Sequence, residues 1–185
     1  MHLDTFDNSD FDRGSSRLME ALWQTIAGIF FQSWIPGSAW RVVILRLFGA
    51  RVGKGVVIKA HARIKFPWKL SIGDYSWIGE SVWIDNLAEV HIGKNCCLSQ
   101  GAYLCTGNHR WDLDSFDLVT SPIVIEDQCW IGAMAQIAPG VICREGSVLA
   151  MGSLASANLE PWHIHSGTPA QAIKKRPVTQ SKRHG

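Results

Sequence analysis

Residues 90–104 read VHIGKNCCLSQGAYL, and in this stretch an aliphatic side chain returns at every sixth position. The same spacing runs from Arg51 to Leu159, broken by two-residue insertions after the first and second sets of three and by one longer gap. The sixfold positions are Val52, Ile58, Ile64, Ile72, Ile78, Ile84, Ile92, Leu98, Leu104, Ile125, Ile131, Ile137, Cys143, Leu149 and Ala155. A period of six fits neither the 3.6-residue period of a helix nor a long strand, and it is typical of a parallel β-helix. Since three hexads make one triangular coil, the pattern predicts an all-β solenoid of about five coils.

Residues 1–50, which precede the first hexad, are expected to hold a polar arm and two helices. The first helix begins near Ser16 and carries apolar residues at helical spacing, Pro36-Gly37 ends it, and the second runs from Ser38 to Gly49. We expect both helices to cover the open end of the first coil. A second interpretation is contact with a membrane surface through aromatic residues, with two arginines nearby. These residues are Trp23, Phe30, Phe31, Trp34, Arg41 and Arg46.

The remaining chain divides into the β-helix, residues 51–160, and a C-terminal segment with a basic tail, residues 161–185. The tail cations are Lys174, Lys175, Arg176, Lys182 and Arg183. The formal net charge of the whole chain is only +2, so no nucleic-acid partner is expected. The outward positions Trp77, Trp83 and Trp130 predict an oligomer, because large exposed aromatic side chains are usually covered by a partner.

The cysteines and the N-terminus indicate the compartment. Five cysteines are present without CxxC spacing, and several fall on inward positions of the repeat, which is typical of buried thiols in a reducing compartment. The first residues lack the pattern of a secretory signal. We therefore expect a cytoplasmic protein without a bound metal, placed at the inner face of the membrane if the helices contact lipid.

The repeat is interrupted between Thr106 and Pro122, where the sequence begins Thr-Gly-Asn-His-Arg-Trp. A protruding loop is expected here, and loops that leave a rigid solenoid commonly carry its function. The candidate in this loop is His109, because an imidazole with an ordinary pKa near ~6.5 is largely neutral at physiological pH and can accept a proton.

These features together resemble a known family. The hexads, the Thr-Gly-Asn-His loop, residues 122–132 (PIVIEDQCWIG), residues 138–141 (APGV) and residues 167–170 (GTPA) resemble the left-handed β-helix acetyltransferases. Among them the chain is most similar to the colanic-acid-biosynthesis type of O-acetyltransferase, including its helical extension. The resemblance implies left-handed winding, a homotrimer, acetyl-CoA as co-substrate in a groove between neighbouring β-helices, and a sugar or glycan intermediate as acceptor in surface-glycan biosynthesis.

The resemblance also implies roles for individual residues. His109 matches the general base, which takes the proton of a sugar hydroxyl as that hydroxyl attacks the thioester. Asp85 and Trp111 match positions near the acceptor. Positions along the cofactor are matched by Trp130 and Ala133 near the thioester, Met151, Gly152 and Ser153 along the pantetheine, Gly167, Pro169 and Ala170 in the closing motif, and Lys174, Lys175 and Arg176 near the phosphates. The chain departs from the family pattern at Ala157, Cys143-Arg144 and Thr168.

Other functions use the same architecture. Galactoside or maltose acetylation and serine acetylation are the nearest alternatives. A zinc carbonic anhydrase of the gamma type would need three histidines, for which His61, His91 and His109 are available, but the paired HxxxxH spacing is missing from the coils. A trimeric scaffold without chemistry is the last alternative, and His109 together with the Gly-Thr-Pro-Ala motif argues against it.

Overall fold

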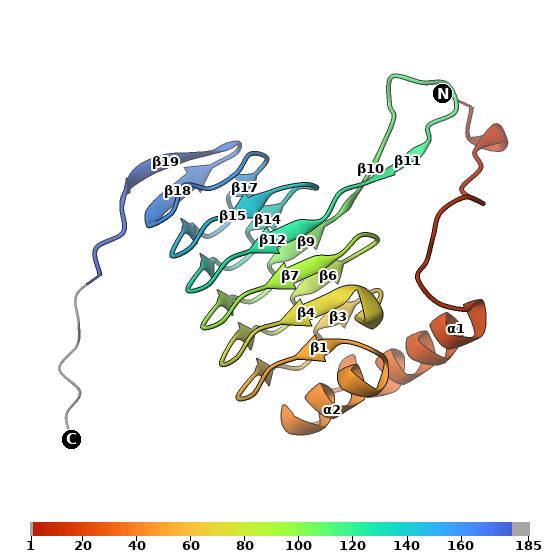
Figure 1. The fold of residues 1–185 in the computed structure, drawn as a ribbon, viewed down its shortest axis with the longest axis horizontal. Coiled ribbons are helices and arrows are strands. Elements are labelled where there is room, and N and C mark those ends of the chain that lie inside the picture. Colours follow the sequence, from red (N-terminus) through yellow and green to blue (C-terminus); the bar gives the residue numbers. More distant parts are fainter. Residues whose placement is uncertain (1, 179–185) are drawn as a thin grey trace.

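A computed structural model describes residues 2–178, in which the chain winds into a triangular parallel β-helix with two helices across its first coil and a hairpin protruding from its side (Figure 1). Lys182 and Arg183 of the basic tail lie outside the described residues. The expected fold class, an all-β parallel solenoid with a helical extension and a protruding loop, is confirmed.

The coils are formed by short strands that follow one another in threes. The first three coils contain β1 (Arg51–Val52), β2 (Val57–Ile58), β3 (Arg63–Ile64), β4 (Leu70–Ile72), β5 (Trp77–Ile78), β6 (Trp83–Asp85), β7 (Val90–Ile92), β8 (Cys97–Leu98) and β9 (Tyr103–Cys105). The next two contain β12 (Ile123–Ile125), β13 (Trp130–Ile131), β14 (Gln136–Ile137), β15 (Ile142–Cys143), β16 (Val148–Leu149) and β17 (Leu154–Ala155). A sixth coil begins at Leu159, which pairs with Cys143, and the chain ends in β18 (His163–Gly167) and β19 (Ala170–Lys175).

The strands stack into three sheets, one on each side of the prism. Sheet A has the order β1-β4-β7-β12-β15, sheet B has β2-β5-β8-β13-β16-β18-β19, and sheet C has β3-β6-β9-β14-β17. All neighbours are parallel except β18 and β19. The predicted period of six therefore corresponds to one strand and one corner. The number of coils differs slightly from the expected five, because a partial sixth coil follows the five complete ones.

The sixfold residues form ladders inside the prism. In sheet A, Ile72 pairs with Ile92, which pairs with Ile125, which pairs with Cys143, and all four side chains are buried. Each coil therefore buries its apolar residue against the coils on either side, which is the main source of stability in a solenoid. Close stacking also explains the corner glycines, because a Cβ on Gly73 would lie 2.6 Å from the carbonyl carbon of Gly93 in the next coil.

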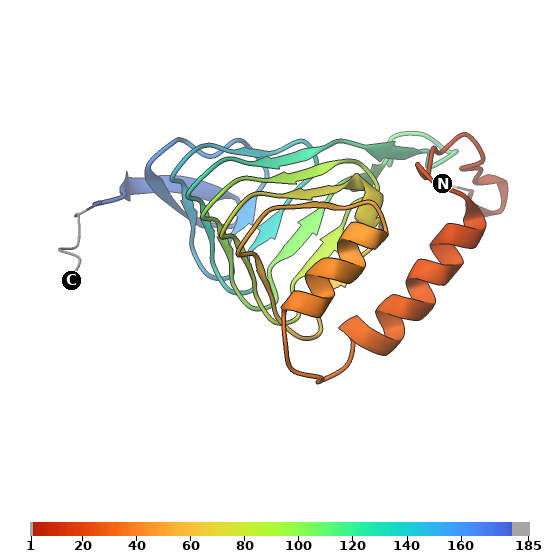
Figure 2. The ribbon, with the colours of Figure 1, turned by 60° about the horizontal axis from the view of Figure 1, so that its bottom comes forward.

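The helical extension covers the first coil (Figure 2). Helix α1 (Arg17–Ile26) begins at Ser16, whose hydroxyl accepts from the amide of Met19 at 3.2 Å, and it continues as a turn of π-helix, η2 (Ala27–Phe31). Helix α2 (Ala39–Leu47) follows. Buried side chains on the inner side of both helices include Trp23, Phe31, Val42 and Leu45. The indole N–H of Trp23 donates to the carbonyl of Ile64 at 2.9 Å, so α1 is fixed to the coil by a buried hydrogen bond.

The shorter elements complete the description. A short 3₁₀ turn, η1 (Leu3–Thr5), lies in the arm, and a second, η3 (Pro67–Lys69), lies between the first and second coils. Strands β10 (Gly107–His109) and β11 (Leu118–Thr120) form the protruding hairpin. Within residues 2–178, the helices are too short or too polar to cross a membrane.

Candidate functional site

The hairpin of β10 and β11 leaves the solenoid between β9 of sheet C and β12 of sheet A, where the repeat is interrupted. Its two strands are antiparallel, with Gly107 opposite Thr120 and His109 opposite Leu118. The buried Thr106 fixes its base, because its hydroxyl donates to the carbonyl of Asp85 at 3.0 Å and accepts from the amide of Ala88 at 3.0 Å. The loop predicted from the break in the repeat is therefore a defined β-hairpin that presents His109.

His109 is half-buried and held by one residue of the same hairpin. Its Nδ1 lies 2.8 Å from the carbonyl oxygen of Phe116, and its ring stacks on the Phe116 ring with centroids 4.2 Å apart and an angle of 3° between the planes. A carbonyl oxygen can only accept, so Nδ1 carries the proton in this hydrogen bond and Nε2 keeps its lone pair. This tautomer is the one that a general base needs.

The N-terminal arm lies against the hairpin, which the sequence analysis did not anticipate. The ring of Phe6 contacts the His109 ring at 5.6 Å, and the amide of His2 donates to the carbonyl of Asp114 at 2.9 Å. A pocket of about 240 Å³ lies between the arm, the first coils and the hairpin. Its lining comprises Phe6, Asn8, Phe11, Arg13, Lys65, Phe66, Leu87, His109 and Leu118.

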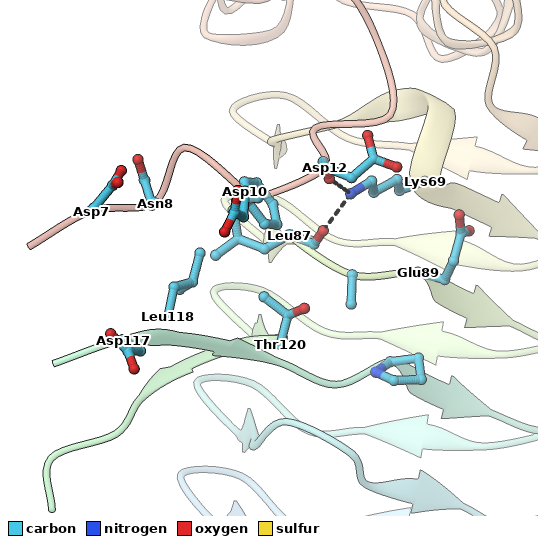
Figure 3. A pocket seen from close by; sticks show the side chains of 13 residues that line it. Asp7, Asn8, Asp10, Asp12, Lys69, Leu87, Glu89, Asp117, Leu118 and Thr120 are labelled. Carbon is cyan, nitrogen blue, oxygen red and sulfur yellow. Dashed lines mark hydrogen bonds between the residues drawn. The ribbon is translucent and has the colours of Figure 1, made fainter. Parts of the chain in front are cut away.

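The other end of the arm is fixed to η3. The indole N–H of Trp68 donates to the carbonyl of Arg13 at 2.7 Å, and Lys69 Nζ donates to the carbonyls of Asp12 at 2.6 Å and Leu87 at 2.8 Å (Figure 3). Burial lowers the pKa of Lys69, an effect that the neighbouring carboxylates partly oppose. Gly14 has a φ of +73°, and a Cβ on it would lie 3.0 Å from Lys69 Cε, so the arm turns where only glycine fits without strain.

A larger hollow of about 870 Å³ lies under the arm, beside the His109 pocket (Figure 3). Carboxylates contribute most of its charge, and Lys69 is the single cation in its lining. The carboxylates are Asp7, Asp10, Asp12, Glu89 and Asp117. Carboxylate oxygens are acceptors only, so this wall can receive hydrogen bonds from a ligand rich in hydroxyl groups.

Asp85 lies at the end of β6, next to the His109 pocket rather than in its lining. Its carboxylate is 3.4 Å from Lys65 Nζ, and its second oxygen accepts a long hydrogen bond of 3.4 Å from the Tyr103 hydroxyl. The oxygen that faces Lys65 is buried and has no well-aligned hydrogen bond, so this contact is mainly electrostatic. Burial, more than the neighbouring Cys105 and Asp85, raises the pKa of Tyr103. The Asp85 carboxylate thus has no direct contact with His109 in the structure; it contacts Lys65, which lines the same pocket as His109.

Trp111 is 81% exposed near the tip of the hairpin, and its side chain lines neither pocket. Its amide donates to the His109 carbonyl at 2.9 Å, which fixes the backbone beside the histidine. Of the two residues matched to the acceptor, Asp85 is therefore half-buried next to the His109 pocket, and Trp111 is exposed outside both pockets.

The residues matched to the cofactor lie near the starts of the strands of sheet C, whereas the hairpin follows the end of one of these strands. The turns after β13 and β16 stack on each other, with the amide of Gly152 donating to the carbonyl of Ala133 at 2.9 Å. The buried Ser153 hydroxyl accepts from the amide of Gly167 at 3.0 Å, which joins these turns to the closing motif. Trp130 and Met151 are exposed beside them. The structure therefore brings Trp130, Ala133, Met151, Gly152, Ser153 and Gly167 into one region.

The closing motif is the turn between β18 and β19. Gly167 pairs with Ala170, and the peptide bond between Thr168 and Pro169 is cis. Lys174 and Lys175 are exposed on β19. Arg176 is not exposed in the same way, because its guanidinium donates to the carbonyls of Gln128 at 2.7 Å and Gly146 at 3.0 Å. Of the three cations matched to the phosphates, Arg176 is thus already engaged in holding a corner together.

A single chain does not bring His109 together with the residues matched to the cofactor. The parallel strands β9 and β14 pair within sheet C, the hairpin follows the end of β9, and the turn of Ala133 precedes the start of β14. The histidine and the cofactor positions therefore lie at opposite ends of the strands of one sheet. His61, His91 and His109 likewise do not converge, and the described part of the chain contains no cluster of three or more metal-binding side chains.

Comparison with known proteins gives consistent similarities. The model of a family described as hexapeptide repeat of succinyl-transferase matches residues 122–154. The chain is 38% identical over 170 residues to the putative colanic acid biosynthesis acetyltransferase WcaF of Escherichia coli K12, covering 91% of this chain and 93% of that protein. A hexapeptide-repeat acetyltransferase from Vibrio cholerae, solved in complex with acetyl-CoA, has a TM-score of 0.80 at 24% identity and covers 95% of this chain and 97% of that one. A maltose O-acetyltransferase from Clostridium difficile 630 has a TM-score of 0.80 at 22% identity, covering 88% and 90%.

Proposed function

This chain belongs to the hexapeptide-repeat acyltransferases, and from that membership we propose that it transfers the acetyl group of acetyl-CoA to a sugar hydroxyl in the biosynthesis of an exopolysaccharide or another surface glycan. The similarity to WcaF over nearly the whole chain supports the acetyl donor and the pathway class. The arrangement of His109 and Phe116 is the observation that carries the chemistry, because it leaves Nε2 with a lone pair on an imidazole whose residue lines a pocket.

In the proposed reaction, His109 Nε2 accepts the proton of the sugar hydroxyl as its oxygen attacks the thioester carbonyl carbon. A tetrahedral intermediate forms with negative charge on the former carbonyl oxygen, which a backbone N–H in the turn from Trp130 to Ala133 would stabilise. Collapse of the intermediate breaks the carbon–sulfur bond. The proton on Nε2 then passes to the departing thiolate, so the products are the acetyl ester and free CoA, and the enzyme returns unchanged.

We also propose a homotrimer, because a single chain leaves His109 and the cofactor positions at opposite ends of sheet C. A neighbouring copy that places its turns beside the hairpin would complete the site. Trp77 and Trp130 support such an interface, since both are about half-exposed on the outer face of sheet B. Acetyl-CoA would then lie between two copies, along Met151, Gly152 and Ser153.

The cofactor's far end would meet the closing motif. Pro169 and Ala170 lie at its turn, and the exposed Lys174 and Lys175 follow on the same strand, where they would meet phosphates as mobile point charges. Arg176 is less available for this role, because its Nη1 already donates to two backbone carbonyls.

The acceptor would enter the pockets between the arm and the hairpin. Phe6 and Phe11 offer apolar surface for a sugar ring, and the carboxylates under the arm offer acceptors for its hydroxyl groups. Asp85 would act through Lys65, and the exposed Trp111 would contact a more distant part of a longer glycan. The five cysteines, which are free thiols, fit a cytoplasmic location.

The decisive experiment is an acceptor panel. Purified protein would be incubated with acetyl-CoA and either nucleotide-linked sugars, lipid-linked saccharides, simple galactosides, maltose or serine, while released thiol and acetylated product are measured. We expect product with a glycan precursor and none with serine. Preferred acetylation of serine, or a failure to consume acetyl-CoA with every acceptor, would overturn the proposal. Acetylation of galactosides or maltose alone would favour the second candidate, which the C. difficile structure supports only through its fold.

A further inference from the structure

The helical extension has an apolar outer side as well as an apolar inner side. On α2, Val42 and Leu45 are buried against the first coil, while Val43 and Leu47 are exposed, and Leu47 keeps 78% of its surface. Residues 43 and 47 lie about half a turn away from the buried pair, since each residue advances a helix by about 100°. These two side chains therefore point away from the solenoid.

Helix α1 and the following segment continue this surface. Leu18, Leu22 and Ile29 are exposed and share one side of the helical stretch, since they are four and then seven residues apart. Trp34 is 82% exposed and Ile35 is also exposed in the segment that joins the helices. The outer surface, defined here as Leu18, Leu22, Ile29, Trp34, Ile35, Val43 and Leu47, lies on the helices that cross the first coil (Figure 2). Apolar patches of this kind mark interaction sites.

Positive charge predominates around this outer surface, although Glu20 lies on α1 and Glu80 lines a pocket together with Trp34 and Lys59. Between Glu20 and Asp74 the sequence contains no carboxylate, whereas lysine and arginine recur throughout. These cations are Arg41, Arg46, Arg51, Lys54, Lys59, Arg63, Lys65 and Lys69. In the first coil, Arg51, Lys54 and Lys59 are exposed at its strands and corners.

Arg41 adds a buried positive charge beside the same surface. Its side chain is 2% exposed, its guanidinium donates to the carbonyls of Ile35 at 2.8 Å and Gly37, and it stacks over Trp40. Its partners in the structure are backbone carbonyls and an aromatic ring, so no carboxylate compensates the charge, and burial lowers its pKa without removing the charge. The end of the solenoid therefore combines apolar side chains with an excess of positive charge.

We propose that this end of the solenoid docks on the surface of an anionic lipid bilayer. The aliphatic side chains and Trp34 would enter the interface, and Arg51, Lys54 and Lys59 would meet headgroup phosphates, which is the pattern of an interfacial amphipathic helix. A bilayer fits better than a second copy of the chain, because two such ends facing each other would bring like charges together. Crossing the bilayer is excluded for α1 and α2, which have 10 and 9 residues where about 20 are needed. The proposal does not depend on the catalytic role of His109.

The test is flotation of the full-length protein with vesicles. We expect binding to vesicles that contain equal parts of phosphatidylglycerol and phosphatidylcholine, and at least about tenfold weaker binding to phosphatidylcholine alone. The variant Arg51→Gln/Lys54→Gln should lose most of this preference, whereas Lys174→Gln/Lys175→Gln, which removes two exposed cations at the other end, should bind like the wild type. Equal binding to both vesicle types, or to neither, would overturn the proposal.

The apolar contribution needs its own matched pair. Trp34→Gln/Leu47→Gln should weaken binding to anionic vesicles about tenfold or more, while Trp111→Gln/Met151→Gln, which removes side chains of similar exposure elsewhere, should not. Circular dichroism and thermal unfolding would confirm that both variants are folded. Unchanged vesicle binding by the first variant would contradict the proposal. So would a concentration-dependent assembly that this variant abolishes in the absence of lipid, since a second copy would then be the occupant.

Discussion

The imidazole of His109 lies flat on the phenyl ring of Phe116, and its Nδ1 is 2.8 Å from the carbonyl oxygen of the same residue. Both contacts depend on the backbone of Phe116, which has a φ of +52°, a conformation that side chains other than glycine adopt at a cost. One strained residue therefore sets both the orientation of the imidazole and the nitrogen that carries its proton. This arrangement suits a base that must present Nε2 to a substrate.

Replacing the imidazole tests the proposed base directly. His109→Ala should lower the turnover of acetyl transfer by about 10² to 10⁴-fold, because a positioned general base contributes about that factor. Binding of acetyl-CoA, measured by calorimetry, should be retained. His91→Ala is the control, since His91 lies on sheet A and contacts Ser71 at 2.7 Å, and its turnover should match the wild type. A His109→Ala variant with unchanged turnover would remove the proposed mechanism.

The Phe116 ring should contribute to positioning rather than to chemistry. In Phe116→Asn the residue tolerates the left-handed conformation but loses the stacking, so we expect turnover to fall about two- to tenfold, the equivalent of one aromatic pair. The KM for acetyl-CoA should not change. Phe116→Tyr keeps the ring and should restore most of the activity. If Phe116→Tyr were as impaired as Phe116→Asn, the ring contact would not be what orients His109.

The coils could be predicted well from the sequence, because the repeat is a local pattern that fixes which residues are buried. Residues such as Ile92 and Leu98 could be assigned to the interior from their spacing alone, and the break after Thr106 located the hairpin. The arm could not be placed in this way. Phe6 contacts His109 across a large separation in sequence, and no periodicity links the two. The one available signal was Gly14, whose positive φ permits the turn that directs the arm along η3.

The winding direction and the cofactor residues came from resemblance rather than from spacing. A period of six predicts the stacking of coils but carries no information on hand, and a turn such as Ala133 differs little in sequence from other corners. Resemblance carries no information on contacts, as Arg176 illustrates, since a basic residue in the expected place also forms two structural hydrogen bonds. Only the contacts of the folded chain distinguish it from the exposed Lys174.

Gly14 offers a way to release the arm without substituting a residue that lines either pocket. In Gly14→Ala the new Cβ would approach Lys69 Cε at 3.0 Å and Trp68 Cδ1 at 3.1 Å, and the φ of +73° would cost about 1–2 kcal/mol. We expect the KM for the acceptor to rise and the KM for acetyl-CoA to stay constant. Gly28→Ala is the matched control, because its Cβ meets nothing within 4 Å, and it should be neutral or slightly stabilising. An unchanged acceptor KM in Gly14→Ala would show that the arm does not form the acceptor site.

Asn86 should be important for stability at the point where the arm is anchored. Its fully buried side chain accepts from the amide of Phe66 at 3.0 Å and donates to the Phe66 carbonyl at 2.6 Å. Asn86→Ala leaves the buried Phe66 amide without a partner and the Phe66 carbonyl with only the Lys69 amide at 3.0 Å, so the free energy of unfolding should fall by about 2–3 kcal/mol. Asn158→Ala removes one hydrogen bond, to the amide of Ile142, at an exposed position and should cost about 1 kcal/mol or less. Equal losses in the two variants, measured by urea unfolding, would contradict this assignment.

His165 should make the stability of the sixth coil depend on pH. Its side chain is buried, its Nε2 accepts from the amide of Glu160 at 3.1 Å, and its Nδ1 is buried without a partner. Burial lowers its pKa in the folded state, so the unfolded chain, with an imidazole pKa near ~6.5, takes up a proton first as the pH falls. Protonation therefore favours unfolding, and the contribution to stability that is complete above about pH 6.5 is progressively lost below it.

The variant His165→Gln isolates this contribution, because its amide oxygen can still accept from the Glu160 amide but cannot titrate. Thermal unfolding would be measured at about pH 7.5 and about pH 5.5. The Tm of the wild type should fall further between these two pH values than the Tm of His165→Gln. The control His91→Gln, which changes a residue on the outer face of sheet A, should show the same decrease in Tm as the wild type. If the Tm of the wild type and the Tm of His165→Gln decreased equally, the buried imidazole would not be the group that links protonation to unfolding.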